Sequence, residues 1–406
     1  MHRILHTSDW HIGRRLKDHD RTREFREFFE WLEKTIEREK PDTLLVAGDI
    51  FDNTTPSIQS QDMYYSFLST AAKSSCRHIV IISGNHDSPA FLDAPAKILA
   101  LNDIHVIGQA RENPADEVIT LCGSDRQPEL VVCAVPYLRD RDVRTARSTE
   151  NFSEIERALR AGIMSHYAEV FGAAKDYGVP VVAMGHMFLE KGVTMQDGGE
   201  RSLYVGTAVK LGTDIFPEWV SYTALGHLHS PQAVGRKNIR YSGSPIPMTF
   251  GEAEGAKSVS IVELEGENLA EVREIPVPVF QMLKHVEGKT MHELAAKIDA
   301  LGSMNKSVWL DVSYTGTEAA SNLQERVMDC AGRYTLLEVL GVHDEAKLPE
   351  HTGGGEFSGR RLDDIEPEKM FELLMDSKVI APDEREEFRI MYREILLMAE
   401  AEVSSK

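Results

Sequence analysis

The chain has 406 residues, of which 42% are hydrophobic and 27% charged, a balance typical of a globular protein with two or three domains. Its formal net charge of −20 excludes a general attraction to nucleic acid or anionic lipid, so local basic groups must hold any polyanionic partner. No apolar run reaches the roughly 18 residues of a membrane span, which excludes a transmembrane role. The four cysteines show no metal-binding spacing and no signal peptide is recognisable, so we expect a cytoplasmic protein with free thiols.

The first part of the chain alternates short β-branched strands with longer helices, which is typical of βα units. Strands are predicted at 3–7, 43–48, 78–83, 104–108, 130–135 and 179–184. Helices are predicted at 23–39, 58–72, 94–101 and 154–176. Further strands, predicted at 222–227, 231–235, 239–244, 257–266 and 269–275, indicate a second sheet packed on the first. These elements define a first domain at residues 1–275.

Pro276 and Pro278 mark the end of this domain, because proline cannot continue a central strand ladder. A small α/β unit is predicted at residues 279–341, with helices at 291–301 and 318–330 and strands at 307–314 and 334–340.

Residues 342–361 include three consecutive glycines and no apolar period, which predicts a flexible linker. Residues 362–406 are predicted to form a helical pair with an apolar stripe, which includes Phe388, Met391, Ile395 and Met398. This stripe can fold back on its own domain or dock on a partner, and the pattern leaves both alternatives open.

Five short polar motifs follow predicted strands. They are Asp9-Trp-His11, Gly48-Asp49-Ile-Phe-Asp52, Gly84-Asn85-His86-Asp87, Gly185-His186 and Gly226-His227-Leu-His229. Each alone is compatible with a structural role, but the carboxyl ends of strands in an α/β sheet open into one crevice, so we expect them to converge. Oxygen and imidazole donors without a thiolate are a ligand set for two divalent cations that share one carboxylate. The predicted ligands are Asp9, His11, Asp49, Asn85, His186, His227 and His229.

In this order the motifs D-x-H, GD-x-x-D, GNHD, GH and GH-x-H resemble the calcineurin-like metallophosphoesterase superfamily, and the resemblance covers essentially the whole chain. It implies an α/β fold: a two-sheet αββα sandwich with a smaller α/β capping domain and a C-terminal helical tail. It also implies one metal held by Asp9, His11, Asp49 and His229, and a second held by Asp49, Asn85, His186 and His227. We expect manganese (Mn2+), since a site without thiolate gives no special reason for zinc.

The resemblance further implies that His86, beside ligand Asn85, protonates the leaving oxygen of a phosphodiester. Asp87 is expected to hold the His86 imidazole protonated and oriented. Some relatives outside the bacterial branch carry a histidine where this chain has Asp52. We expect the Asp52 carboxylate to contact His11 or His86 without binding a metal itself.

Within the superfamily, the blocks VAGDIFD, ISGNHDS and TALGHLHSPQAVG resemble bacterial DNA nuclease subunits. This implies cleavage of DNA ends and hairpins in DNA repair, recombination and replication. A 3′–5′ exonuclease activity on duplex DNA would need a coiled-coil ATPase partner, bound through the C-terminal helices, whereas single-strand endonuclease activity would not. The resemblance also implies a homodimer. The face of Met63, Tyr64, Phe67 and Leu68 is one candidate surface, but such a stripe also fits an ordinary core.

Arg14 and Arg15 are the candidate DNA contacts. A second basic cluster, from Arg139 to Arg147, is interrupted by aspartates and fits a solvated loop equally well. The segment GEAEGAKS at 251–258 approximates a phosphate-binding loop but lacks its second glycine and precedes a strand, so we expect no ATP binding. Two alternatives keep the fold: a metallophosphoesterase that is not a nuclease, and a scaffold that has lost catalysis.

Overall fold

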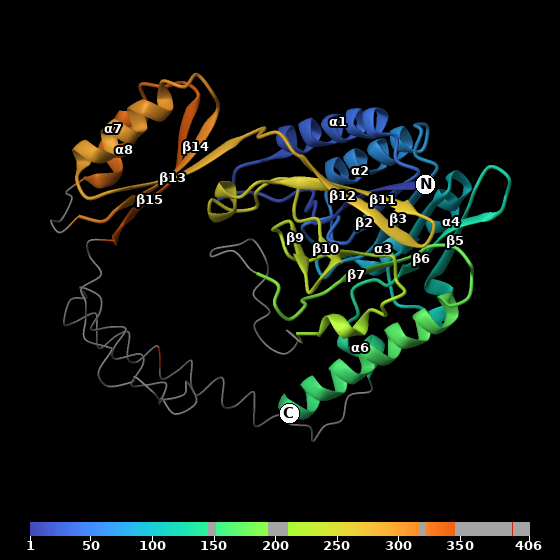
Figure 1. The fold of residues 1–406 in the computed structure, drawn as a ribbon. Helices are drawn as coiled ribbons and strands as arrows, with labels where there is room; N and C mark the ends of the chain where they lie inside the picture. The colour runs from blue at the N-terminus through green and yellow to red at the C-terminus, as the bar shows by residue number, and fades with distance from the viewer. Residues whose placement is uncertain (145–151, 194–209, 317–321, 346–391, 393–406) are drawn as a thin grey trace.

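Two six-stranded sheets pack face to face between helices. The computed structural model describes residues 1–144, 152–193, 210–316, 322–345 and 392. Figure 1 shows helices α1 and α2 on the outer face of one sheet and α6 on the outer face of the other. A layer of aliphatic side chains between the sheets, which includes Leu45, Val80, Val132 and Val182, completes an αββα sandwich.

The first sheet has the strand order β12-β11-β1-β2-β3-β4, in which β1 to β4 are mutually parallel. Its strands are β1 (His2–Thr7), β2 (Thr43–Ala47), β3 (His78–Ile82), β4 (Ile104–Ile107), β11 (Ser258–Glu265) and β12 (Asn268–Pro276). The second sheet has the order β5-β6-β7-β8-β10-β9, and its four central strands are also parallel. Its strands are β5 (Val118–Cys122), β6 (Pro128–Ala134), β7 (Val181–His186), β8 (Tyr222–Gly226), β9 (Gln232–Val234) and β10 (Arg236–Tyr241).

The helices cover the sheets through apolar faces that recur every three or four residues. Helix α1 (Thr22–Glu39) buries Phe25, Phe28 and Leu32 against the first sheet. Helix α2 (Ile58–Ala71) begins at Ser57, whose hydroxyl accepts a hydrogen bond from the backbone N–H of Ser60. The remaining helices of the sandwich are α3 (Pro89–Asp93), α4 (Ala96–Leu99), α5 (Asp140–Val143) and α6 (Phe152–Ala174).

A small α/β unit follows the sandwich and has its own core. Its parallel strands are β13 (Met282–Gly288), β14 (Val308–Tyr314) and β15 (Leu337–Asp344), with helices α7 (Met291–Gly302) and α8 (Leu323–Ala331). In Figure 1 this unit, in orange, stands to one side of the two large sheets. Lys17 forms an ion pair with Asp311, and His19 lies 3.0 Å from Glu338, so the loop after the first motif contacts the small unit directly.

The structure confirms the predicted αββα sandwich and the smaller α/β unit, with local corrections. Strands β5 and β13 are additional to the predicted ones. The predicted helix at 94–101 is shorter: α4 begins after Pro95 and ends at Leu99, where a 3-10 turn of residues 100–102 follows. Helix α3, which precedes Pro95, is additional to the predicted helices. Strand β12 includes Pro276, because at the sheet edge a missing N–H leaves no partner unsatisfied. Strand β15 runs to Asp344, so residues 342–344 are not linker. The predicted helical pair at 362–406 lies outside the described residues, apart from residue 392.

Of the two alternatives for the face of Met63, Tyr64, Phe67 and Leu68, the structure supports the ordinary core. Met63 is 7% exposed, and Tyr64, Phe67 and Leu68 are 1% exposed each, because they belong to the core cluster that also contains Phe29 of α1. All four cysteines are free, as expected. Across the described part of the chain, no helix is both long and apolar enough to cross a membrane.

A buried ion pair at the start of α1 provides a stability test. The Arg21 guanidinium donates to both carboxylate oxygens of Glu24, at 2.7 and 2.8 Å, and also to the carbonyl oxygen of Pro247. Arg21 is only 2% exposed, so Glu24→Ala leaves a buried cation unpaired and should lower the free energy of unfolding by about 3–5 kcal/mol.

The matched control is Glu27→Ala on the same helix, which breaks the solvent-accessible pair with Arg23 and should cost about 0–1 kcal/mol. Urea unfolding followed by circular dichroism measures both. Equal losses in the two variants would contradict a special role for the buried pair.

Candidate metal centre

The five polar motifs meet at the carboxyl ends of β1, β2, β3, β7 and β8. Each motif begins within or just after its strand, and these edges of the two sheets face each other. Asp9, His11, Asp49, His186 and His229 are each at most 2% exposed. The structure therefore brings the predicted ligands together in one buried cluster.

Four of the seven predicted ligands have a left-handed backbone conformation. The φ angles are 53° for Asp9, 47° for His11, 50° for Asp49 and 101° for His227. Positive φ is uncommon outside glycine and costs energy, so it persists only where the surrounding structure enforces it. Each motif loop turns sharply at the strand end, and this turn directs the side chain into the cluster.

Glycines of the motifs allow the loops to approach closely. A Cβ atom at Gly84 would lie 2.1 Å from Asp49 Oδ1, and one at Gly48 would lie 2.4 Å from His186 Nδ1. Any larger residue at either position would displace a predicted ligand. The pairing of glycine with aspartate or asparagine in these motifs is thus a packing requirement of the cluster.

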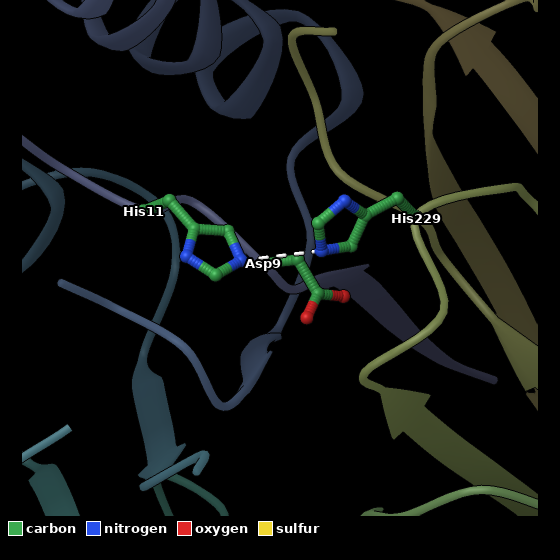
Figure 2. Close-up of side chains that lie close together, drawn as sticks. All are labelled: Asp9, His11 and His229. Carbon is green, nitrogen blue, oxygen red and sulfur yellow. Dashed lines mark hydrogen bonds between the residues drawn. The ribbon is translucent and has the colours of Figure 1, made fainter. Parts of the chain in front are cut away.

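One group of donors comprises Asp9, His11 and His229 (Figure 2). His229 Nδ1 donates to Glu252 Oε1 at 2.9 Å, so in the neutral ring its Nε2 carries a lone pair. That Nε2 lies 3.2 Å from His11 Nε2, and His11 Nδ1 is buried and has no hydrogen-bond partner among the described residues. Two imidazole nitrogens therefore face each other beside a carboxylate.

A second group comprises Asn85, His186 and His227. His186 Nδ1 lies 2.9 Å from the carbonyl oxygen of Ala47, which can only accept, so in the neutral ring Nε2 again carries a lone pair. This Nε2 lies 3.0 Å from Asn85 Oδ1 and 3.3 Å from Asp49 Oδ2. His227 Nδ1 lies 3.1 Å from the same Asn85 oxygen.

Asp49 links the two groups. Its Oδ2 lies 3.6 Å from His11 Nε2 and 3.3 Å from His186 Nε2, while its Oδ1 accepts the backbone N–H of His86. The lone pairs of the Asp49 carboxylate and of the neighbouring imidazole nitrogens point toward one another here, with few hydrogen atoms between them. This arrangement is unfavourable unless positive charge is present. Oxygen and imidazole donors without thiolate fit a divalent cation.

Burial and the mutual proximity of Asp49 and the histidines also shift the pKa values of these residues. Burial works to lower the pKa of His186, but the negative charge of Asp49 outweighs it and raises that pKa to about 9. Burial also opposes ionisation of Asp49, yet the neighbouring histidines hold its pKa well below its usual range. Burial lowers the pKa of His227 to about 3, which keeps its ring neutral as a metal ligand must be.

Glu252 supports the cluster, and sequence reasoning misses it. It accepts from His229 Nδ1, from Lys257 Nζ at 2.7 Å and from the backbone N–H of Met248. Although burial works to raise the pKa of Glu252, the bond from His229 and the charge of Lys257 hold it well below its usual range. Both Glu252 and Lys257 belong to the segment 251–258, which is no phosphate-binding loop by sequence, and strand β11 follows it as expected. The segment contains three charged residues, Glu252, Glu254 and Lys257, and its sequence does not distinguish the buried two from the exposed Glu254.

The structure corrects the role of Asp87. Its carboxylate accepts hydrogen bonds from the backbone N–H groups of Ile50, Phe51 and Gly84, and among the described residues none comes from the His86 ring. Asp87 therefore fixes two motif loops to each other instead of orienting His86. His86 Nδ1 lies 2.8 Å from the backbone carbonyl oxygen of Asp52, which holds the ring.

Asp52 and one of the two candidate DNA-contacting arginines, Arg14, lie close to the cluster. The Asp52 carboxylate lies 3.7 Å from His11 Nδ1 and 3.0 Å from Arg14 Nη1, so it contacts His11 through its side chain and His86 through its backbone. Arg14 is consequently paired with an acid, whereas Arg15 is exposed and bonds the carbonyl of Asp18.

Loss of the Glu252 carboxylate should weaken metal binding. Glu252→Gln leaves Lys257 unbalanced and no longer enforces the His229 tautomer, so we expect metal affinity to fall about 10–100-fold. Calorimetric titration with Mn2+ measures this. Glu254→Gln, on an exposed neighbour, should leave the affinity unchanged, and an equal loss there would contradict the prediction.

A methyl group at Gly84 should displace Asp49. Because the added Cβ of Gly84→Ala would lie 2.1 Å from Asp49 Oδ1, we expect loss of metal binding in the same titration. Gly172→Ala is the control, since no atom lies within 4 Å of its added Cβ. Undiminished metal binding in Gly84→Ala would show that the loop adapts.

Comparison with known proteins assigns the family. The family model of the calcineurin-like phosphoesterases matches residues 2–231, and that of the type 5 capsule protein repressor C-terminal domain (SbcD_C) matches residues 279–379. The SbcD subunit of nuclease SbcCD from Escherichia coli K12 is 32% identical over 80% of this chain and 81% of its own. The proteins of the same name from Rhodobacter capsulatus and Bacillus subtilis are 33% and 34% identical, over 74% and 64% of this chain and 76% and 66% of theirs. The chain therefore belongs to the SbcD family of calcineurin-like, metal-dependent phosphoesterases.

Proposed function

We propose that this chain is the nuclease subunit of an SbcCD-type complex and hydrolyses DNA phosphodiester bonds at a centre of two divalent cations. The observation that carries the proposal is the position of Asp49 Oδ2, which lies 3.6 Å from His11 Nε2 in one donor group and 3.3 Å from His186 Nε2 in the other. A carboxylate that faces two ligand groups suits a pair of cations, and paired cations serve in-line displacement at phosphorus.

In this proposal Asp9, His11, Asp49 and His229 hold one cation, and Asp49, Asn85, His186 and His227 hold the other. The absence of thiolate among these ligands favours Mn2+ over zinc. When bound, the cations would polarise the scissile phosphate and activate a water. Glu252 and the carbonyl of Ala47 fix the His229 and His186 rings so that their Nε2 atoms face the cations.

His86 is the proposed proton donor to the leaving oxygen. Its Nδ1 donates to the carbonyl oxygen of Asp52, so only Nε2 can exchange a proton with a substrate. The ring packs edge-on against His11, with centroids 4.7 Å apart, and this contact with a proposed ligand supports its role beside the cations. Asp87 acts indirectly, by fixing the loop that carries Asn85 and His86.

The relatives are named as subunits of SbcCD, which supports an SbcC-like coiled-coil ATPase as the partner of this chain. We propose that residues 362–406 bind it, joined by a linker within 342–361 to a capping domain at 279–341 and a nuclease domain at 1–275. DNA ends and hairpins are the proposed substrates, with 3′–5′ duplex degradation assisted by the ATPase. A homodimer and a cytoplasmic location stay predictions from sequence.

The direct test is cleavage of an end-labelled DNA hairpin by the purified chain with Mn2+. We expect cutting that a chelator abolishes and Mn2+ restores. His86→Gln should lower kcat about 10²–10⁴-fold, the usual contribution of a general acid, with little change in KM. His292→Gln, at an exposed position on α7, should have no effect.

Two results would contradict the proposal. Full activity of His86→Gln would exclude His86 as the donor. A wild-type chain that hydrolyses bis(p-nitrophenyl) phosphate but no DNA would be a phosphoesterase that is not a nuclease.

A further inference from the structure

Two cation–aromatic pairs contact the Asn85–His186–His227 half of the centre. In one pair the Arg139 guanidinium lies 5.9 Å from the centroid of the Tyr137 ring, which packs edge-on against His186 at 6.2 Å. In the other pair Lys210 Nζ lies 4.9 Å from the Phe188 ring, which packs edge-on against His227 at 6.3 Å. A single aromatic ring therefore separates each cation from a predicted ligand.

Arg139 is held in place by contacts that leave its charge uncompensated. Its Nη2 donates to the backbone carbonyl of Asp87, within the same motif as Asn85. The nearby acids serve other groups: Asp140 pairs with Arg144, and Asp142 lies 3.7 Å from Arg141 and accepts the backbone N–H of Arg139. Within the described part of the chain, the Arg139 guanidinium forms no ion pair.

Lys210, like Arg139, lies over an aromatic ring that packs against a predicted ligand. Its neighbour Leu211 donates its N–H to the carbonyl oxygen of Phe188 and accepts the N–H of Glu190, so a short bridge fixes Lys210 beside the Phe188 ring. Glu190 pairs with Arg160 at 3.1 Å. No acid among the described residues pairs with Lys210, which is exposed.

Arg139 belongs to the second basic cluster of the sequence, which fitted a solvated loop equally well there, whereas Lys210 was not among the residues that the sequence suggested. Arg14 is neutralised by Asp52, and Arg15 bonds a backbone carbonyl away from the cluster. In a chain of net charge −20, cations beside the centre that have no acidic partner among the described residues are the local attraction that a polyanion requires. Contact with an aromatic ring holds a cation in place, and because the ring is neutral the positive charge is not cancelled.

We propose that Arg139 and Lys210 bind the DNA phosphates on either side of the scissile phosphate and position the strand across the centre. This inference rests on the proposed nuclease function and names the residues that hold its substrate. Arginine suits the role at Arg139 because one edge of its guanidinium bonds Asp87 while the rest of the planar fork can face a phosphate.

The test is the salt dependence of binding to a fluorescent single-stranded oligonucleotide, measured by anisotropy in chelator so that no cleavage occurs. For single strands the slope of log affinity against log salt is about −0.7 per phosphate contact. Arg139→Gln and Lys210→Gln should each reduce the magnitude of the slope by about 0.7. Arg139→Lys should retain it, because the charge is kept.

Matched controls remove the same charge from the same segments: Arg141→Gln on α5 and Lys191→Gln, both at exposed positions. They should leave the slope within error of wild type. Hydrolysis of bis(p-nitrophenyl) phosphate, which has no flanking phosphates, should be unchanged in all variants.

The inference is overturned if Arg139→Gln and Lys210→Gln change the slope no more than their controls do. It is also overturned if they lose hydrolysis of the small diester in proportion to DNA cleavage, since both residues would then support the cluster and not the strand. Failure of the proposed nuclease function is a separate result, because it appears in the wild-type chain as an absence of chelator-sensitive DNA cleavage.

Discussion

The buried carboxylate of Asp49 is the interaction on which the site depends. A carboxylate at 2% exposure is costly without compensating charge, and the groups beside its Oδ2 are the imidazole nitrogens of His11 and His186, of which His186 directs its Nδ1 to the carbonyl oxygen of Ala47. Bound divalent cations would relieve this conflict, so the groups that repel one another here would supply the binding energy for metal. The negative charge of Asp49 also favours a proton on the His186 ring, and for this reason the pKa of His186 is raised to about 9.

The ligands around Asp49 are held by their own backbone conformations, by hydrogen bonds from neighbouring residues and by the packing of the two sheets. The left-handed conformations of Asp9, His11 and Asp49 direct their side chains inward from the strand ends. Behind them Asp87 binds two loops through backbone N–H groups, and Glu252 with Lys257 holds the His229 ring. The two sheets fix the spacing between these loops, because a rigid layer of buried aliphatic side chains separates them. Precision at the centre thus derives from the sandwich as a whole.

Charge organises the surroundings of the centre at longer range. The chain is strongly acidic, yet Arg139 and Lys210 beside the histidine-rich half lack acidic partners among the described residues. Arg14, by contrast, is neutralised by Asp52. The small α/β unit contacts the loop that begins with the first motif, through Lys17 and His19. The position of that unit is therefore coupled by direct contacts to the loop that carries His11 and Arg14.

The sequence by itself determined the sandwich, the small unit and the set of polar motifs, because short strands followed by polar residues reveal both the sheets and the edge where ligands gather. It could not determine the partners of individual side chains. Asp87 sits next to His86 in sequence but bonds the backbone of Ile50 and Phe51, and the His86 ring is held by a carbonyl of Asp52. Met63 and Tyr64 form a stripe that fits a surface or a core, and only packing under α1 decided for the core. Glu252, 23 residues from His229, and Lys210, distant in sequence from Phe188, contact these residues because the fold brings distant segments together, and a local sequence pattern carries no record of that proximity.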